Sequence, residues 1–208
     1  KIISEIIFVD DNSNDETYSE LVKITKHLKK IKIILSKYFS RDLSKSVMLG
    51  VKAAKNELIV VLDADLQHRP MYVNYMYKIL KKKKLDVVIG SRFLNKRFLG
   101  NLGFLRSFMS LSSIFIINYL LKKKSTDPFS GFFLCKKDLI LKYEKKFFLQ
   151  GYKILFDIIY NGKKNILIND IPIVFAKRYS GKSKFNLKII RIFIRQFYYT
   201  LKSNKNGV

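Results

Sequence analysis

Short apolar runs alternate with longer amphipathic segments along the first half of the chain. The apolar runs are rich in Ile, Val and Leu, which favours buried β-strands, and they cover residues 6–9, 31–35, 58–62 and 86–90. The segments between them carry apolar residues at helical spacing and predict α-helices over residues 15–30, 43–55 and 71–84. Fully apolar strands that alternate with helices indicate a parallel sheet covered on both faces, so the pattern predicts an α/β fold. Ligands of such sheets bind beyond the carboxyl ends of the strands.

The second half of the chain has a less regular pattern. It predicts helices over residues 105–121, 152–160 and 185–201, a strand over 129–134, and a bent strand or strand pair over 166–175. We find neither an internal repeat nor a linker rich in Pro, Gly and Ser, so we expect one domain. The longest run without a charged residue, 107–121, is shorter than the about 20 residues of a transmembrane helix. We therefore expect no segment that spans a bilayer, and the first residues do not read as a signal peptide.

Composition and charge narrow the possible functions. The chain has 208 residues, of which 48% are hydrophobic, so it can fill a sizeable core and is neither disordered nor a small disulfide scaffold. Its 41 Lys and Arg against 16 Asp and Glu give a net charge of +25, which points to a polyanionic neighbour. Nucleic acid, an anionic membrane surface and a phosphorylated substrate all fit. The single cysteine, Cys135, lies in an apolar run, so we expect a buried structural thiol and a reducing compartment.

Two acidic clusters follow directly after predicted strands. Residues 10–15 follow the first strand, and a turn with a helix cap accounts well for Ser13 and Asp15. That interpretation is less adequate for Asp63 and Asp65, two carboxylates at the end of a fully apolar strand. Two such carboxylates repel each other unless a cation joins them, and hard oxygen ligands select Mg²⁺ or Mn²⁺. The pattern therefore predicts a site for a metal ion and a phosphate.

Six motifs in order carry a resemblance to a known family. Residues 9–17 (VDDNSNDET) resemble the nucleotide-binding signature of family-2 glycosyltransferases, and residues 63–68 (DADLQH) resemble the signature of their polyprenyl-phosphate branch, the dolichol-phosphate mannosyltransferases and bacterial relatives. The other four motifs keep the family's order and lie at residues 90–92, 127–132, 151–155 and 178–184. The resemblance covers nearly the whole chain.

The resemblance implies a GT-A fold, in which helices flank a mostly parallel, Rossmann-like sheet. Compared with the family, the chain starts almost on the usual second strand, so we expect the usual first strand to be absent. The family's Gly-rich turn is also replaced at residues 42–46. We expect residues 1–184 to form an N-terminally incomplete glycosyltransferase domain, and residues 185–208 to add a basic amphipathic helix at the membrane interface.

The resemblance also implies the reaction. A sugar would pass from a nucleotide diphosphate sugar, GDP-mannose or UDP-glucose, to a polyprenyl phosphate, with Mg²⁺ or Mn²⁺ and with inversion at the anomeric carbon. The acceptor phosphate is already an anion at neutral pH, so it needs no strong general base. We accordingly expect His68 to cap or pack beside Pro70 rather than to transfer a proton. Such an activity belongs to the synthesis of cell-envelope glycans.

The motifs assign candidate residues to this chemistry. The metal ligands are Asp63, Asp65 and Gln67. The donor nucleotide is expected on Asp10, Asp11, Ser13 and Asp63. The acceptor phosphate is expected on Arg92, Arg106, Ser110, Ser130 and Lys184, because arginine suits phosphate groups. The catalytic residues are expected to be Asp65, Arg92 and Arg178.

Two further assignments leave alternatives open. Asp127 either shapes the acceptor side or forms a plain turn with the following proline, and residues 178–184 are expected to act as a mobile lid. The last helix and the residue before it place Lys184, Lys188, Arg191 and Arg195 on one face, so the helix either lies among lipid headgroups or packs as an ordinary surface helix. We expect association with the cytoplasmic face of a membrane and no nucleic-acid partner. A nucleic-acid-binding module and an inactive relative that docks on membranes are the alternative functions.

Overall fold

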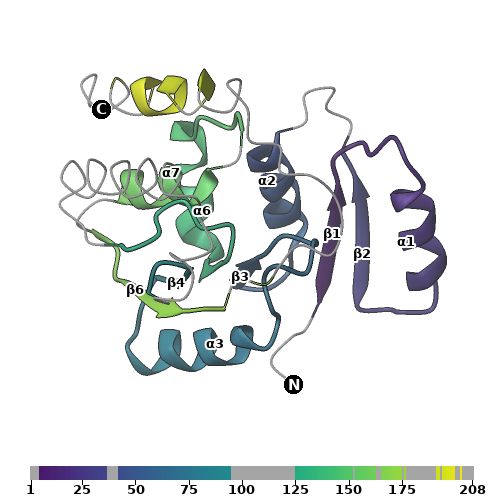
Figure 1. The fold of residues 1–208 in the computed structure, drawn as a ribbon, viewed down its shortest axis with the longest axis horizontal. Coiled ribbons are helices and arrows are strands. Elements are labelled where there is room, and N and C mark those ends of the chain that lie inside the picture. Colours follow the sequence, from purple (N-terminus) through teal and green to yellow (C-terminus); the bar gives the residue numbers. More distant parts are fainter. Residues whose placement is uncertain are drawn as a thin grey trace.

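Strands and helices alternate through the first half of the chain, as predicted (Figure 1). The computed structural model describes residues 5–36, 42–94, 125–151, 153–162, 165–174, 176, 191–192, 194–199 and 202. The first seven elements are β1 (Ile6–Asp10), α1 (Thr17–Thr25), β2 (Ile31–Leu35), α2 (Leu43–Ala53), β3 (Leu58–Val61), α3 (Tyr72–Lys82) and β4 (Val87–Ser91). The predicted boundaries agree with these to within a few residues, except that α1 ends earlier.

The second half adds two strands and further helices. They are β5 (Phe133–Lys136), α6 (Lys137–Tyr143), the 3-10 helix η1 (Glu144–Lys146), α7 (Ile154–Gly162) and β6 (Ile168–Pro172). Residues 191–192 and 194–199 are also helical. The sequence did not predict α6, because this helix starts directly after β5 and no turn residues separate the two elements. The helix predicted over 105–121 lies outside the described residues.

The described strands form two sheets. Strands β1 and β2 pair in parallel, with Ile6 opposite Ile31, and the other four strands form a sheet of order β3-β5-β4-β6. Strands β4 and β6 are parallel, whereas β5 runs antiparallel to both of its neighbours. Apart from β5, the predicted parallel arrangement is confirmed. The reversed strand between β3 and β4 was not expected from the sequence.

Strand β5 also begins later than the predicted strand over 129–134. The backbone N–H of Ser130 donates to the carbonyl of Asp127 at 3.1 Å, which closes a turn around Pro128. The Ser130 hydroxyl donates to the carbonyl of Gly90 at 2.8 Å and holds this turn against β4. Because these bonds occupy residues 127–130, the extended backbone starts only at Phe133.

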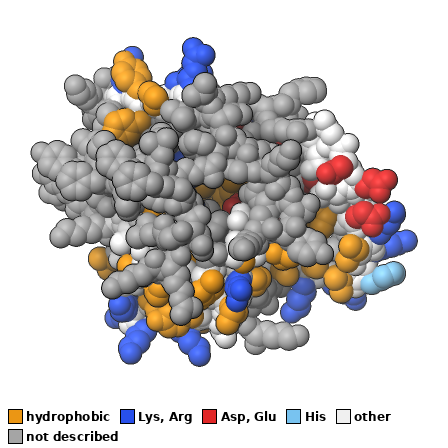
Figure 2. Space-filling model, viewed as in Figure 1, with side chains coloured by type: hydrophobic (Ala, Val, Ile, Leu, Met, Phe, Trp, Pro, Cys, Tyr) orange, Lys and Arg blue, Asp and Glu red, His pale blue; other side chains and the backbone are white. Residues whose placement is uncertain are grey.

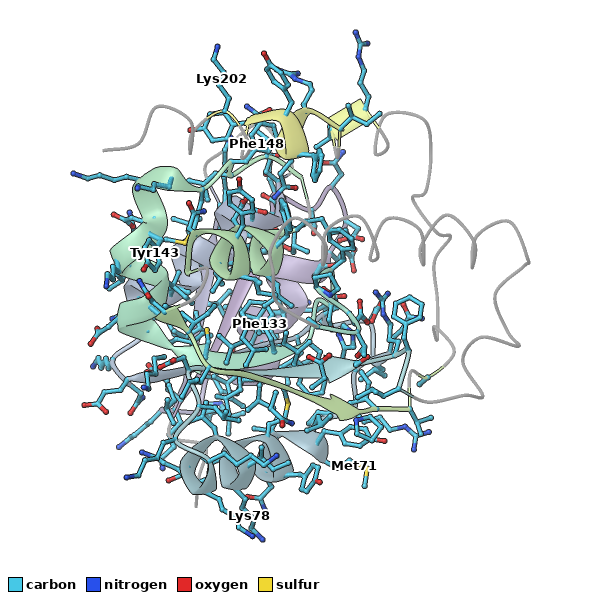
Figure 3. All side chains as sticks on the ribbon, turned by 90° about the vertical axis from the view of Figure 1, so that its left-hand side faces the viewer. Met71, Lys78, Phe133, Tyr143, Phe148 and Lys202 are labelled. Atoms are coloured by element: carbon cyan, nitrogen blue, oxygen red, sulfur yellow. The ribbon has the colours of Figure 1, made fainter. Side chains whose placement is uncertain are left out.

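The four-stranded sheet is covered on both faces, as its apolar strands predicted. Side chains alternate across β4, so Ile89 enters one core and Val88 the other, and both are fully buried. The first core joins the sheet to α2, α6 and α7, and the second joins it to α3. Figure 3 shows Phe133 near the centre of the molecule, with α7 above it and α3, which carries Lys78, below. Cys135 is fully buried in the first core, which confirms the structural interpretation of this thiol.

Helix α1 is shorter than predicted and lies outside both cores. It has no buried residue, and the turn that ends it is closed by the N–H of Leu28 donating to the carbonyl of Thr25 at 2.8 Å. Its place beside the two-stranded sheet is seen at the right of Figure 1. The apolar face formed by Leu21 and Ile24 contributes little burial, since Ile24 is 69% exposed.

The described residues of the C-terminal helix pack against α7 on one side, as expected for an ordinary surface helix, whereas a position among lipid headgroups stays a prediction. Gln196 is buried and donates from Nε2 to the carbonyl of Lys153 at 3.1 Å, and the Phe197 ring lies 6.4 Å from that of Phe156. The opposite face leaves Ile194 and Tyr198 exposed by 61% and 67%. The helix therefore packs on α7 and also presents an open face. Within the described parts of the chain, no helix has the length and apolar character needed to cross a bilayer.

Replacement of Phe133 by alanine tests the packing of the first core. Phe133 is 1% exposed, so Phe133→Ala should lower the free energy of unfolding by about 3–5 kcal/mol, because it removes a large buried ring and leaves a cavity. Urea denaturation followed by circular dichroism measures this change. Ile24→Ala on exposed α1 is the control, and it should change stability by no more than about 0.5 kcal/mol. Equal effects of the two substitutions would contradict the assignment of the core.

Candidate functional site

The residues singled out from the sequence lie at the ends of β1, β3 and β4 and in the turn before β5. Four of them, Arg106, Ser110, Arg178 and Lys184, lie outside the described residues. The others can be placed. Those after β3 and β4 and in the turn before β5 are far apart in the sequence but lie together, whereas Asp10, Asp11 and Ser13 lie at or after the end of a strand of the two-stranded sheet.

The loop after β3 is a tight turn that carries both aspartates. The backbone N–H of Asp63 donates to Nδ1 of His68 at 3.2 Å, and Asp65 Oδ1 accepts from the N–H of Gln67 at 3.1 Å. Leu66, between them, adopts a left-handed φ of 63°. His68 is 2% exposed and stacks on Phe132 with ring centroids 5.3 Å apart. This placement agrees with the packing role expected for His68.

The charges around Asp63 oppose one another. Burial raises the pKa of Asp63, and the nearby Asp65 carboxylate raises it further, whereas His68, Lys153 and Arg92 lower it. Burial lowers the pKa of His68, so the imidazole is more easily kept neutral than it is in water. An additional cation beside Asp63 and Asp65 would relieve the repulsion between the two carboxylates.

Gly131 packs directly against the carboxylate of Asp63. A Cβ placed on Gly131 would lie 3.0 Å from Asp63 Oδ2 and 3.3 Å from His68 Cε1, closer than side chains ordinarily approach. The backbone of the turn before β5 therefore comes directly up to the carboxylate. Any side chain larger than hydrogen at residue 131 would crowd the oxygen atoms that a ligand must reach.

The oxygen atoms of Asp63 and Asp65 suit a hard divalent cation. Mg²⁺ is typically held by one or two carboxylates together with substrate phosphates, so two aspartates fit such an ion. In the part of the chain that the structure describes, no group of three or more His, Cys, Asp or Glu side chains could hold a metal ion. The remaining ligands would then come from Gln67 and from a substrate. The Gln67 amide nitrogen donates to the carbonyl of Ala176 at 3.2 Å.

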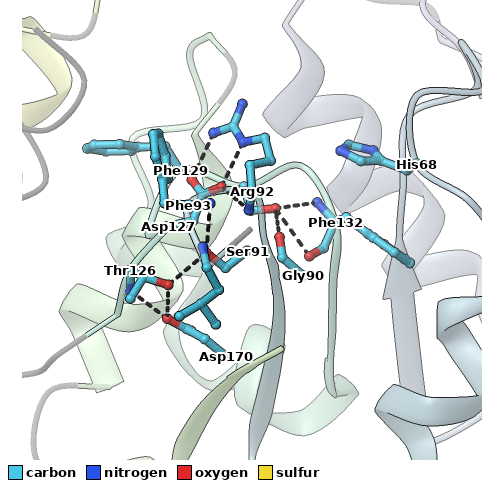
Figure 4. Close-up of polar contacts among 12 residues, drawn as sticks. His68, Gly90, Ser91, Arg92, Phe93, Thr126, Asp127, Phe129, Phe132 and Asp170 are labelled. Carbon is cyan, nitrogen blue, oxygen red and sulfur yellow. Dashed lines mark hydrogen bonds and ion pairs between the residues drawn. The ribbon is translucent and has the colours of Figure 1, made fainter. Parts of the chain in front are cut away.

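Arg92 and Asp127 form a two-pronged ion pair beside this loop (Figure 4). Arg92 Nε lies 2.7 Å from Asp127 Oδ2, and Nη2 lies 2.8 Å from Oδ1. The backbone N–H of Arg92 adds a third bond to Oδ2 at 3.2 Å. Asp127 is fully buried. Burial alone would lower the pKa of Arg92, but the Asp127 carboxylate more than offsets this and raises the pKa. Asp127 is thus more than a turn residue, because it fixes the direction of the guanidinium group.

Lys153 is a second cation of the site, and sequence reasoning gave it no role. Its Nζ donates to the carbonyl of Phe129 at 3.2 Å and lies 5.5 Å from the centre of the Phe129 ring. Burial, together with the charge of Arg92, lowers the pKa of Lys153 from 10.5 to about 8, while Asp127 and Asp63 oppose the shift. The only signal in the sequence was its place in the motif at residues 151–155.

The loop after β1 leaves one carboxylate oxygen without a partner. Asp10 is buried, and its Oδ1 accepts from the N–H of Ser13 at 2.8 Å, while Asp15 accepts from the N–H of Thr17 at 3.0 Å at the start of α1. These bonds agree with the turn interpretation of Ser13 and Asp15, whereas the N-cap residue of α1 is Glu16, whose side chain makes no capping hydrogen bond. Asp11 Oδ1, by contrast, is buried and accepts no hydrogen bond. Such an atom is costly unless a donor from a ligand reaches it.

Ser130 is engaged with backbone atoms. Besides donating to Gly90, its hydroxyl accepts from the N–H of Phe132 at 3.1 Å. Its expected role in binding the acceptor phosphate stays a prediction, and the bonds seen here give it a role in shaping the turn that carries Gly131.

Comparison with known proteins gives matches over most of the chain. The family model described as Glycosyl transferase family 2 matches residues 3–143. The dolichol-phosphate mannosyltransferase of Pyrococcus furiosus is 32% identical over 200 residues, which cover 95% of this chain and 55% of that protein. The dolichol-phosphate mannosyltransferase of Saccharomyces cerevisiae is 27% identical over 216 residues, which cover 99% and 78%. The chain therefore spans only about half the length of the Pyrococcus protein.

Solved structures share the fold at low sequence identity. Glucosyl-3-phosphoglycerate synthase of Mycobacterium tuberculosis superimposes with a TM-score of 0.62 at 16% identity, over 95% of this chain and 68% of that one. The structure of that enzyme with Mn²⁺, UDP-glucose and phosphoglyceric acid gives a TM-score of 0.66 at 14% identity, over 95% and 67%. These likenesses confirm the expected α/β fold of the GT-A type.

Breaking the ion pair should destabilise the protein. Asp127→Asn keeps the shape of the side chain but leaves the Arg92 charge without its buried partner, so we expect a loss of about 3–5 kcal/mol in the free energy of unfolding. Urea denaturation measures it. The double variant Arg92→Met, Asp127→Asn should recover part of the loss, because the uncompensated charge is gone. A double variant that is less stable by the sum of the two single effects would contradict this account.

Lys153 should give stability a pH dependence in the alkaline range. Its pKa falls from 10.5 when unfolded to about 8 when folded, so between these values the unfolded chain binds a proton that the folded protein does not. The contribution of Lys153 to stability therefore rises as the pH rises from about 8 to 10.5. The difference in unfolding free energy between wild type and Lys153→Met should change by on the order of 3 kcal/mol across this window.

Urea denaturation at several pH values measures that difference. Lys142→Met, on the exposed surface of α6, is the matched control, and its difference from wild type should stay constant over the same range. A constant difference for Lys153→Met as well would show that the lysine is not desolvated in the folded protein.

Proposed function

The chain belongs to glycosyltransferase family 2, and from this membership we propose that it transfers a sugar from a nucleotide diphosphate sugar to a polyprenyl phosphate. The resemblance first noted in the six motifs is thereby confirmed. The finer assignment to a lipid phosphate rests on the relatives that are named dolichol-phosphate mannosyltransferases. Because the chain spans only part of their length, the activity, substrates and partners of the whole protein are part of the proposal.

The observation that carries the proposal is the juxtaposition of two acids and two cations at the ends of β3 and β4. Asp63 is coupled electrostatically to Asp65 on its own loop and to Arg92 and Lys153 from other segments. A sugar transfer of this kind brings together a diphosphate and a second phosphate. Their negative charge calls for protein cations, and a divalent ion on the carboxylates would add to them.

The donor nucleotide is proposed to bind at the ends of β1 and β3, on Asp10, Asp11, Ser13 and Asp63. The buried, unpartnered oxygen of Asp11 supports this placement, because a hydroxyl or N–H group of the nucleotide would satisfy it. GDP-mannose is our first choice of donor, since the curated relatives are mannosyltransferases, and UDP-glucose is the second.

A divalent cation, Mg²⁺ or Mn²⁺, is proposed to bind to Asp63 and Asp65, with the side-chain oxygen of Gln67 as a further ligand. When bound, the ion would neutralise charge that builds up on the leaving nucleoside diphosphate. Gly131 has no side chain that would crowd the Asp63 carboxylate. Asp65, whose Oδ1 is fixed by the N–H of Gln67, is held in place for the same purpose.

The acceptor phosphate is proposed to bind to Arg92, whose guanidinium is aimed by Asp127. Arg106, Ser110, Ser130, Arg178 and Lys184 remain predictions for phosphate binding and catalysis. A phosphate oxygen of the acceptor would attack the anomeric carbon from the face opposite the leaving diphosphate, which inverts the configuration. No general base is required, because the attacking oxygen is already anionic. His68 Nδ1 accepts the N–H of Asp63 and is not placed to take a proton.

Association with a membrane is proposed because the acceptor carries a lipid tail. The open face of the C-terminal helix carries two arginines with apolar and aromatic side chains, namely Arg191, Ile194, Arg195, Tyr198 and Tyr199. Such a mixture suits the headgroup region of a bilayer. Figure 2 shows that lysine and arginine side chains also line the lower edge of the molecule, where α3 lies, whereas acidic side chains gather near α1. Location at the cytoplasmic face and the absence of a nucleic-acid partner remain predictions.

A transfer assay with a metal-site variant tests the proposed function. Wild-type protein with Mg²⁺ or Mn²⁺, a panel of labelled nucleotide sugars and a polyprenyl phosphate should move label into the organic phase. EDTA should stop the transfer, and Asp65→Ala should slow it by about a thousandfold or more, because a bound metal supplies several kcal/mol of charge stabilisation.

Asp138→Ala provides the control for that assay, since it removes an exposed acid at the start of α6. It should leave the transfer rate unchanged. Near-normal turnover of a folded Asp65→Ala variant would reject the metal assignment. Failure of the wild-type protein to label lipid with any nucleotide sugar would reject the proposed function itself.

A further inference from the structure

The carboxylate of Asp170 on β6 gathers several hydrogen bonds from a segment far away in the sequence (Figure 4). The Ser125 hydroxyl donates to it at 3.2 Å, and the Thr126 hydroxyl donates at 2.7 Å. The backbone N–H of Thr126 donates to the same carboxylate oxygen as the Thr126 hydroxyl. Neither the motifs nor the expected chemistry drew attention to Asp170. Its bonds tie β6, the last strand in the order of the four-stranded sheet, to residues 125–126.

The segment that Asp170 holds is the one that carries Asp127. The Ser125 hydroxyl oxygen accepts the N–H of Asp127 at 3.3 Å, so a single bridging atom links Asp170 to the backbone of Asp127. The Thr126 hydroxyl is also hydrogen-bonded to the Ser91 hydroxyl at 2.7 Å. Ser91 Oγ in turn accepts the N–H of Phe93 at 3.2 Å, so the contact reaches both sides of Arg92 in the chain.

These hydrogen bonds form a continuous chain from β6 to Arg92. Asp170 fixes residues 125–126, these fix the backbone of Asp127, and the Asp127 carboxylate receives the two guanidinium bonds of Arg92. Burial raises the pKa of Asp170, and the hydrogen bonds from Thr126 and Ser125 oppose that rise. Rigid support of this kind keeps a binding group within the narrow range of positions that its function requires.

We propose that Asp170 is a positioning residue for Arg92, which it orients through residues 125–127. This role rests on the proposed function, in which Arg92 binds the phosphate of the acceptor. Asp170 itself does not touch a substrate. Its loss should loosen the Arg92–Asp127 pair and weaken phosphate binding, while the chemistry at the anomeric carbon is much less affected.

The variant Asp170→Asn keeps the shape of the side chain but spoils the hydrogen bonding. An amide has one oxygen, whereas the carboxylate uses both oxygens to accept from Ser125 and Thr126. The NH₂ group of the asparagine would face at least one of these donors. Asp86→Asn is the matched control, because Asp86 accepts the N–H of Leu167 and pairs with Lys136 beside the opposite end of the same strand pair, β4 and β6.

Hydrogen exchange at the Arg92 side chain tests the proposal without any activity. In the wild-type protein the Arg92 Nε–H is held by Asp127, so its signal in a ¹⁵N NMR spectrum should exchange slowly with solvent. Asp170→Asn should speed that exchange by about tenfold, and Asp86→Asn should leave it unchanged. Unchanged exchange in Asp170→Asn would overturn the proposal. If Asp170→Asn does not fold, Thr126→Val removes one hydroxyl of the network and carries the same test.

Transfer kinetics provide the second test, with farnesyl phosphate as the acceptor. Asp170→Asn should raise the KM for the acceptor by about tenfold with a smaller change in kcat. In an Arg92→Lys background, which lacks the two-pronged group that Asp170 orients, the same substitution should raise KM by less than about twofold. An equal rise in both backgrounds would show that Asp170 acts only on general stability, and it would overturn the proposal. If wild-type protein transfers no sugar, the proposed function fails, and the exchange measurement still decides the role of Asp170.

Discussion

The Arg92–Asp127 ion pair joins the parts of the chain on which the candidate site depends. Arg92 follows β4, Asp127 lies in the turn before β5, and the turn itself is fixed to β4 by Ser130. Burying a charged side chain costs free energy unless an opposite charge contacts it in good geometry, and the two-pronged contact of Arg92 with Asp127 has that geometry. Because the pair sets the turn, it also sets the position of Gly131 and hence the access to Asp63. The Arg92–Asp127 ion pair and the backbone of the turn before β5 thus depend on each other.

The acidic loop after β3 depends on the same arrangement. Local hydrogen bonds to His68 and Gln67 hold Asp63 and Asp65. The His68 ring stacks on Phe132, the residue directly before β5. Burial and the neighbouring Asp65 carboxylate raise the pKa of Asp63, and the cations of Lys153 and Arg92 oppose that rise. Lys153 directly precedes α7, and its backbone carbonyl accepts a hydrogen bond from Gln196 of the C-terminal helix. The face proposed to meet a membrane is therefore connected to the site by one short contact.

The sequence was sufficient to predict what depends on local pattern. Apolar runs marked β1 to β4 because most residues of each strand are buried or half-buried, and the acidic residues after β3 stood out because charge is unusual beside such a run. What could not be predicted are the long-range partners. Asp127 lies 35 residues from Arg92, and Ser125 lies 45 residues from Asp170, so no spacing in the sequence announces either contact. The direction of β5 could not be predicted either, because its three apolar residues and one lysine fit a parallel or an antiparallel strand equally well.

The central place of β5 has a consequence for how the chain must assemble. Strands β3 and β4 are consecutive strands of the sequence, yet they do not pair with each other, because β5 separates them. Leu58 is opposite Lys136, so the gap between the first strands closes only when a segment from much later in the chain arrives. Contacts between distant segments form slowly, since a long loop must close first. During synthesis on the ribosome, the edges of β3 and β4 that pair with β5 therefore stay unpaired until residue 136 has emerged. That interval is when the nascent chain most needs protection from aggregation.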